Sequence, residues 1–133
     1  DDGKFHHVVA TWTPSRIQLY IDGTLEAFNT FSGTFTGTFA NSFIGQNTLN
    51  GNYLNGKVAQ LGLFSRVLTD GEVGDIYKAN HEPLDMIGTN GLVAYYKFDE
   101  GSGTVAIDSS RNGNNGVLQN DAHYVTDVPF KAG

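Results

Sequence analysis

The stretch GKFHHVVATWTPSRIQLYIDG, residues 3–23, predicts paired β-strands because its side chains alternate along an extended chain. The odd-numbered side chains from Phe5 to Thr11 fall on one face of such a chain, and the even-numbered ones from His6 to Trp12 fall on the other. This period of two is typical of a β-strand. We expect Trp12 to pack in the core, because it lies within this strand.

A turn interrupts the alternation, and a second strand follows. Pro14 has no amide hydrogen and a fixed φ, so it belongs in a turn. The alternation resumes from Ile17 to Ile21, and Asp22-Gly23 is a hairpin signal because glycine adopts positive φ at low cost. The stretch is therefore predicted to form two paired strands and to lead into a further turn.

A second informative stretch is GLVAYYKFDEGSGTVAIDSSRNGNNG, residues 91–116. Side chains alternate from Leu92 to Phe98, and Asp99 and the following glycines end this predicted strand. After a short apolar piece, the composition of DSSRNGNNG, residues 108–116, predicts a turn or an Ω-loop.

One short helix is predicted between the two stretches. Thr69 and Glu72 have the spacing of a capping box, in which each side chain bonds the backbone amide of the other residue. Val73, Ile76 and Tyr77 then share one helical face, and Asn80 is able to end the helix.

These motifs resemble a known family. HHVVATW, LYIDG, FIG, NGKVAQLGLFSRVLT and GEVGDIY are similar, in this order, to the C-terminal half of a laminin-G-like domain, the concanavalin A-like jelly roll. Residues 91–116 resemble the beginning of such a domain. The resemblance implies an all-β fold: an antiparallel β-sandwich with one short helix.

The order of the two motif sets is reversed relative to the family. We expect residues 1–80 to be a C-terminal-half-like part, residues 81–91 a connector, and residues 92–133 N-terminal-half-like strands of the same or the next sandwich. Three interpretations follow. The chain is a slice of a tandem array, a permuted compact domain, or a subunit that completes its sandwich with strands of a neighbouring chain.

Composition excludes several classes of function. The formal net charge is −6 and no Lys/Arg cluster occurs, which argues against nucleic-acid binding. No apolar run is long enough to span a bilayer, so membrane insertion is not expected. The absence of cysteine excludes disulfides and cysteine-ligated zinc.

The sequence also argues against an enzyme. His6 and His7 are neighbours in a strand, so they point to opposite faces and cannot converge on one ion or substrate. Jelly-roll glycosidases need two carboxylates on one face, whereas the neighbouring Asp99 and Glu100 diverge.

Calcium is the one cofactor that the sequence suggests. Asp108, Asn112 and Asn114 supply side-chain oxygens within one compact loop, together with Asn115. Laminin-G-like domains often hold calcium, but the resemblance also implies an acidic residue where this chain has Ala59 or Gln60. The alternative is a loop whose side chains satisfy its own backbone.

Loop aromatics beside polar groups are the candidate ligand-binding residues. They are Tyr53 with Asn50 and Asn52, and Tyr124 with His123, because sugars stack on rings and hydrogen-bond to amides. We therefore expect a non-catalytic recognition or adhesion module, extracellular or surface-exposed on a cell or virion, that binds a glycan or a protein partner. The alternative is a structural subunit of a surface fibre or virion, built by strand exchange, with self-association or neighbouring repeats as its partners.

Overall fold

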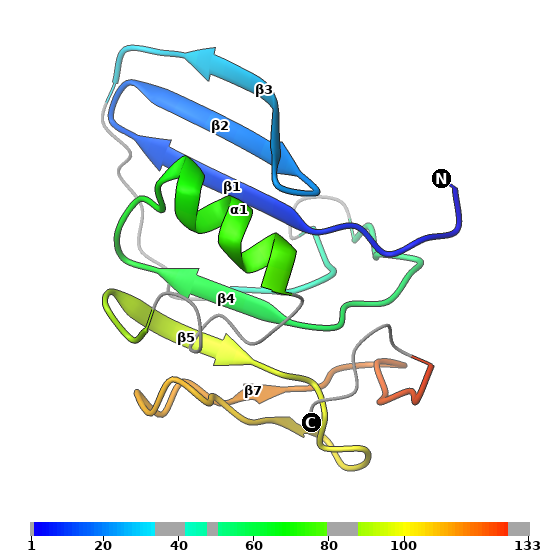
Figure 1. Ribbon diagram of the computed structural model, residues 1–133. Helices are drawn as coiled ribbons and strands as arrows, with labels where there is room; N and C mark the ends of the chain where they lie inside the picture. Colours follow the sequence, from blue (N-terminus) through cyan, green and yellow to red (C-terminus); the bar gives the residue numbers. More distant parts are fainter. Residues whose placement is uncertain (1, 34–41, 48–50, 80–87, 128–133) are drawn as a thin grey trace.

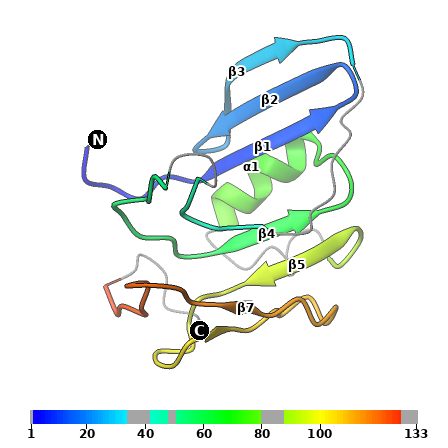
Figure 2. The ribbon, with the colours of Figure 1, turned by 180° about the vertical axis from the view of Figure 1, so that it is seen from behind.

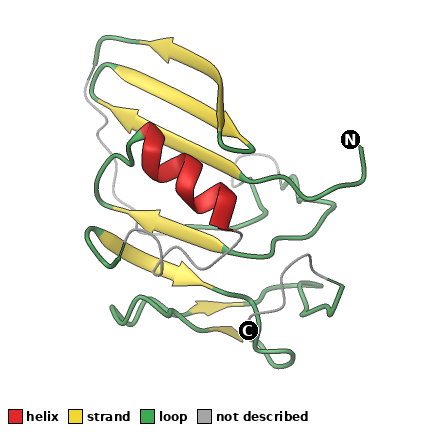
Figure 3. Ribbon diagram, in the orientation of Figure 1, coloured by secondary structure: helices red, strands yellow, loops and turns green. Residues whose placement is uncertain are grey.

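The computed structural model describes residues 2–33, 42–47, 51–79 and 88–127. Each strand pair in this part of the chain is antiparallel, and one helix accompanies the strands (Figures 1 and 3). This confirms the predicted all-β class with one short helix. The elements are β1 (Val8–Thr13), β2 (Arg16–Ile21), β3 (Thr24–Thr30), β4 (Leu61–Phe64), α1 (Asp70–Ala79), β5 (Leu92–Tyr96), β6 (Val105–Ala106) and β7 (Gly116–Val117).

The first stretch forms the predicted hairpin. Strands β1 and β2 pair from Val8 opposite Ile21 to Thr13 opposite Arg16, and β3 extends the sheet in the order β1-β2-β3. The connection between β2 and β3 has φ of 51° at Asp22 and 78° at Gly23. Positive φ at both central residues is the requirement of the tightest hairpin turns, as the Asp-Gly signal predicts.

Helix α1 begins with the predicted capping box. Thr69 Oγ1 accepts the Glu72 N–H at 3.2 Å, and Glu72 Oε2 accepts the Thr69 N–H at 2.8 Å. Arg66 donates to both oxygens of Glu72, at 2.9 and 2.8 Å, and this pairing, ahead of the Thr69 contact, lowers the Glu72 pKa from its usual 4.5 to about 2. Asn80, the predicted end of the helix, lies outside the described residues.

The helix packs against one face of the β1–β3 sheet, which we call the inner face (Figure 1). The core between them consists of buried side chains from both elements and the segment before the helix. Val73 is fully buried, and Tyr20 is 2 % exposed. Leu68 and Ile76 complete the buried cluster, and the partly buried Val9 and Phe64, the last residue of β4, pack against it.

The opposite, outer face of this sheet is open. We define it as the six side chains that alternate with the inner face on β1 and β2. Figure 2 shows no described helix or strand across it. Trp12 is 40 % exposed there, so the expectation that it packs in the core is wrong. The outer face consists of Val8, Ala10, Trp12, Ile17, Leu19 and Ile21.

A second sheet joins two segments from the middle of the sequence. Strand β4 pairs with β5, from Leu61 opposite Tyr96 to Phe64 opposite Leu92. Next to this pair, the Ser65 N–H donates to the Gly91 carbonyl at 2.7 Å. The pairing places one strand of the predicted first part beside one strand of the predicted last part. The proposed division at residues 81–91 stays a prediction, since residues 81–87 lie outside the described part.

Candidate functional site

The polar loop after β6 is organised around one buried carboxylate. Asp108 is 7 % exposed, and its Oδ1 accepts the backbone N–H groups of Tyr95 and Ser110, each at 2.9 Å. Its Oδ2 accepts the Asn114 N–H at 2.9 Å. Burial raises the pKa of Asp108, but the hydrogen bonds from Ser110, Tyr95 and Asn114 outweigh it and bring the pKa to about 2. Asp108 is therefore ionised throughout the physiological range.

The same loop covers the free edge of β5. The Val93 carbonyl accepts three side-chain donors: Ser110 Oγ at 3.1 Å, Asn112 Nδ2 at 3.0 Å and Asn114 Nδ2 at 2.9 Å. Asn112 Nδ2 also donates to the Leu92 carbonyl at 2.9 Å. Side chains of the loop thus take the place of a neighbouring strand, which protects an edge that is otherwise open to pairing.

This geometry bears on the calcium prediction. The structure does bring Asp108, Asn112 and Asn114 together, but both Asp108 oxygens accept backbone N–H groups and both asparagines direct their amide nitrogens to Val93. In this arrangement the residues do not fit a calcium ion, which needs oxygens that converge on one point. No group of three or more His, Cys, Asp or Glu side chains within the described ranges is placed to hold a metal ion. Calcium binding here stays a prediction.

Tyr53 lies on a short ribbon, residues 43–47 and 51–54, which we call the Tyr53 ribbon. Its two sides are joined by the bridge between Gln46 and Tyr53 and by the hydrogen bond from the Leu54 N–H to the Gly45 carbonyl at 2.7 Å. Tyr53 is 64 % exposed. Asn52 is exposed beside it, whereas Asn50 lies outside the described residues. The other large exposed side chains of the ribbon are Phe43, Ile44 and Leu54.

Tyr124, the second predicted aromatic, has different surroundings. It is half-buried, and its hydroxyl donates to the Val105 carbonyl at 2.6 Å. Burial, and then the neighbouring Glu100 carboxylate, raise the Tyr124 pKa to about 12. The neighbouring His123 ring contacts the Asp121 carbonyl at 2.8 Å. The structure therefore gives Tyr124 a role in holding β6 and leaves Tyr53 as the more accessible ring.

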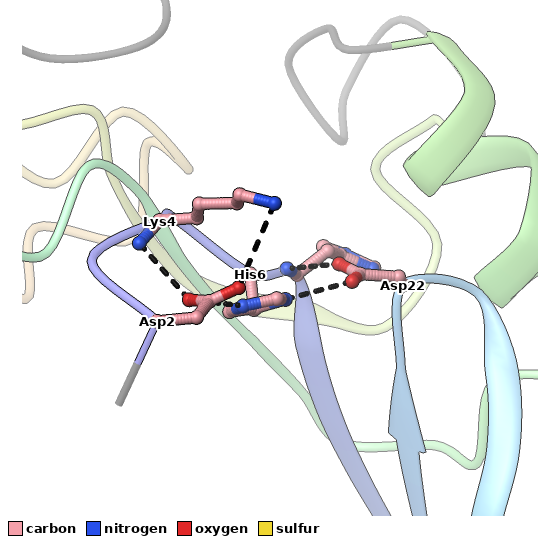
Figure 4. A network of polar contacts seen from close by, with 5 residues as sticks. Asp2, Lys4, His6 and Asp22 are labelled. Atoms are coloured by element: carbon pink, nitrogen blue, oxygen red, sulfur yellow. Dashed lines mark hydrogen bonds and ion pairs between the residues drawn. The ribbon is translucent and has the colours of Figure 1, made fainter.

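The two histidines diverge as the alternation predicts. His7 stacks on Tyr77 of α1, with ring centroids 6.0 Å apart, and burial lowers its pKa. His6 lies on the other side, between the carboxylates of Asp2 and Asp22 (Figure 4). The sequence reasoning missed both partners. When the two strands are paired outward from the turn at Pro14, Asp22 comes to lie opposite His7 and next to His6, so the sequence did contain a signal for this contact.

Comparisons with known proteins place the chain in a structural context. The laminin G-like family model described as the concanavalin A-like lectin/glucanases superfamily matches residues 1–74, more than half of the 133 residues. Among solved structures, the chain is similar to residues 221–444 of an S-layer domain-containing protein from Clostridium thermocellum, with 26% identity and a TM-score of 0.50. That alignment covers 58% of this chain and 41% of the other, so it spans less than half of the solved neighbour. No curated protein matches the chain.

Helix α1, the one helix in the part of the chain that the structure describes, is neither long nor apolar enough to cross a membrane.

Proposed function

Because the chain belongs to the concanavalin A-like lectin/glucanases superfamily, we propose that it is a non-catalytic recognition module outside the cell that binds a glycan or a protein partner. The observation that carries this proposal is the Tyr53 ribbon. A ring that is 64 % exposed, with the amide of Asn52 beside it, provides an apolar platform and a polar group for ligand hydroxyls.

The surroundings of three carboxylates, those of Asp108, Glu72 and Glu100, support a non-catalytic role. A general acid at neutral pH needs a raised pKa, but the pKa values of Asp108 and Glu72 are both about 2. Glu100 Oε1 accepts the Ile107 N–H at 2.6 Å, so it is engaged with the backbone. Asp108 and Glu72 therefore act as fixed anions, which order the loop after β6 and the start of the helix.

The test is binding to an array of glycans, followed by titration of the best ligand with three proteins: the natural chain, Tyr53→Ala and Tyr124→Phe. We expect Tyr53→Ala to weaken binding about fivefold, since loss of an aromatic contact costs on the order of 1 kcal/mol. Tyr124→Phe removes only a hydroxyl that bonds the backbone, so its affinity should match that of the natural chain. Unchanged binding by Tyr53→Ala would exclude the ribbon as the ligand site.

A second candidate function is a subunit of a surface assembly. It is favoured by the outer face, which has no charged side chain and whose Val8 is 59 % exposed. Large exposed apolar patches are typical of interaction sites. The similarity to a protein named for an S-layer domain supports a surface location.

Light scattering over a dilution series tests this second candidate. An assembly subunit should show a mass that rises with concentration, and Leu19→Lys, which places a charge on the outer face, should restore the monomer. A natural chain that stays monomeric at every concentration would rule assembly out. An oligomer that persists in Leu19→Lys would point to strand exchange at a sheet edge.

A further inference from the structure

We propose that His6 is a pH-sensitive clamp, which fixes the N-terminal residues 2–5 to the turn between β2 and β3 while its ring is protonated. The clamp consists of His6 and the carboxylates on either side of its ring (Figure 4). His6 Nδ1 lies 2.7 Å from Asp22 Oδ2, and His6 Nε2 lies 3.1 Å from Asp2 Oδ1. The inference does not depend on which partner the chain binds.

The hydrogen-bond chemistry of the ring carries the inference. An ionised carboxylate only accepts hydrogen bonds, and a neutral imidazole has a single N–H, whereas the imidazolium has two. With a carboxylate oxygen at each nitrogen, only the protonated ring satisfies both contacts. The neutral ring would turn one nitrogen lone pair toward a carboxylate.

The charges around His6 agree with this reading. The Asp22 hydrogen bond, followed by that of Asp2, raises the His6 pKa, and the His6 contact lowers the pKa of both carboxyl groups. Lys4 Nζ lies 3.9 Å from Asp2 Oδ2. Two carboxylates, one imidazolium and one ammonium give a local charge of zero, and loss of the His6 proton changes it to −1.

Hydrogen bonds to His7, directly before strand β1, fix Asp22 more firmly than Asp2. Asp22 sits in the tight turn, its Oδ1 accepts the His7 N–H at 2.9 Å, and its own N–H donates to the His7 carbonyl at 2.8 Å. Asp2 belongs to the N-terminal segment, where it accepts the Lys4 N–H at 3.0 Å. The neutral ring therefore keeps its shorter contact, to Asp22, and releases Asp2.

The raised His6 pKa fixes the direction in which the contribution of this ring to stability depends on pH. A raised pKa in the folded chain means that the contribution of His6 is fully present below about pH 6.5, the usual histidine value, and is lost as the pH rises through the raised value. His7 responds in the opposite sense, because its ring lies against Tyr77 on the inner side and its pKa is lowered. The pH dependence of the segment thus identifies His6 as the responsible group.

The experiment is an NMR titration of the full chain, which follows the His6 ring and the ¹H–¹⁵N heteronuclear NOE of Gly3 and Lys4. We expect a His6 midpoint above about 6.5, with high NOE values below the midpoint and low values above it. Asp2→Asn should lower the midpoint and leave the segment mobile at every pH. Asp127→Asn removes a surface carboxylate of the same kind, one that pairs with Lys57, and should change neither quantity.

Three results would overturn the clamp. They are a His6 midpoint at or below about 6.5, a midpoint that Asp2→Asn does not move, and NOE values of the segment that do not change with pH. His6→Gln assigns the His6 signal and should abolish the pH dependence of the segment. Since His6 and Asp2 are exposed, neither substitution removes a core contact.

Discussion

The two faces of the β1–β3 sheet differ in a way that their composition does not suggest. The inner face carries Thr11, 5 % exposed, and Tyr20, 2 % exposed, and is covered by α1. The outer face has only apolar side chains, yet Trp12 and Ile17 are each 40 % exposed. On β1 and β2 the more apolar face is thus the open one. What covers a face, rather than its own hydropathy, decides whether it is buried.

The buried Tyr20 hydroxyl of the inner face finds its hydrogen-bond partners nearby, which makes its burial possible. The Tyr20 hydroxyl donates to Asp70 Oδ1 at 2.6 Å, and Gln18 Nε2 donates to the Tyr20 hydroxyl at 3.0 Å. Because a buried polar group without a partner costs on the order of 1–3 kcal/mol, this chain of bonds is a condition for packing the helix there.

The largest expected effect comes from a matched pair of isoleucine truncations. Ile76, 8 % exposed, lies in the core under the helix, whereas Ile17, 40 % exposed, lies on the outer face. Ile76→Ala should lower the free energy of unfolding by about 2–5 kcal/mol, and Ile17→Ala by less than about 1 kcal/mol. Urea denaturation of both variants at low protein concentration measures the difference. Equal losses would show that the outer face is covered in solution.

The next effect concerns the helix that covers the inner face. Thr69→Ala removes one half of the capping box and should lower the free energy of unfolding by about 1 kcal/mol.

Since the Glu72 pKa is about 2 rather than 4.5, the contribution of Glu72 to stability is present above about pH 4.5 and is lost as the pH falls toward 2. Glu72→Gln should therefore flatten the acid limb of the stability profile, measured by thermal melting between pH 2 and 5. An unchanged acid limb would contradict the pairing with Arg66.

A smaller effect is expected on the titration of His7, whose ring lies on the inner side of the sheet against Tyr77. Burial lowers the His7 pKa, so the contribution of the neutral ring is present above about pH 6.5 and declines as the pH falls below it. In an NMR titration we expect a midpoint below about 6.5. Tyr77→Ala uncovers the ring and should move the midpoint up toward that value. A midpoint that stays the same in Tyr77→Ala would mean that the stacking contact does not bury His7.

The smallest effect is expected on the outer face. Leu19→Lys changes an exposed position on a strand, so the free energy of unfolding of the monomer should change by no more than about 0.5 kcal/mol. Denaturation at two protein concentrations checks this. A large loss that appears only at the higher concentration would identify the outer face as an interface.

Alternation in the sequence predicted the strands but not which face is inside. The turn at Pro14, the Asp22-Gly23 turn and the capping box are local signals, and the structure confirms all three. The position of Trp12 depends instead on where α1 lies, about 60 residues later in the chain, and no local pattern records such a contact.

In the candidate sites, too, the sequence predicted what lies within one loop but not which distant residues contact it. Composition predicted that Asp108, Asn112 and Asn114 gather in one loop, as they do. Their partners, however, include backbone groups of β5, the Tyr95 N–H and the Val93 carbonyl, and only the fold brings that strand beside the loop. The bond from Tyr124 to Val105 was likewise not readable from the sequence.

Trp12 can report on the outer face by its fluorescence, because it is the only tryptophan among the 133 residues and lies on that face. Indole emission shifts to shorter wavelength when water leaves the ring, so the chain carries its own optical probe at the surface in question. A partner, a second copy or a neighbouring sheet that covers this face would change the emission colour. Binding that leaves this face uncovered would leave the emission unchanged.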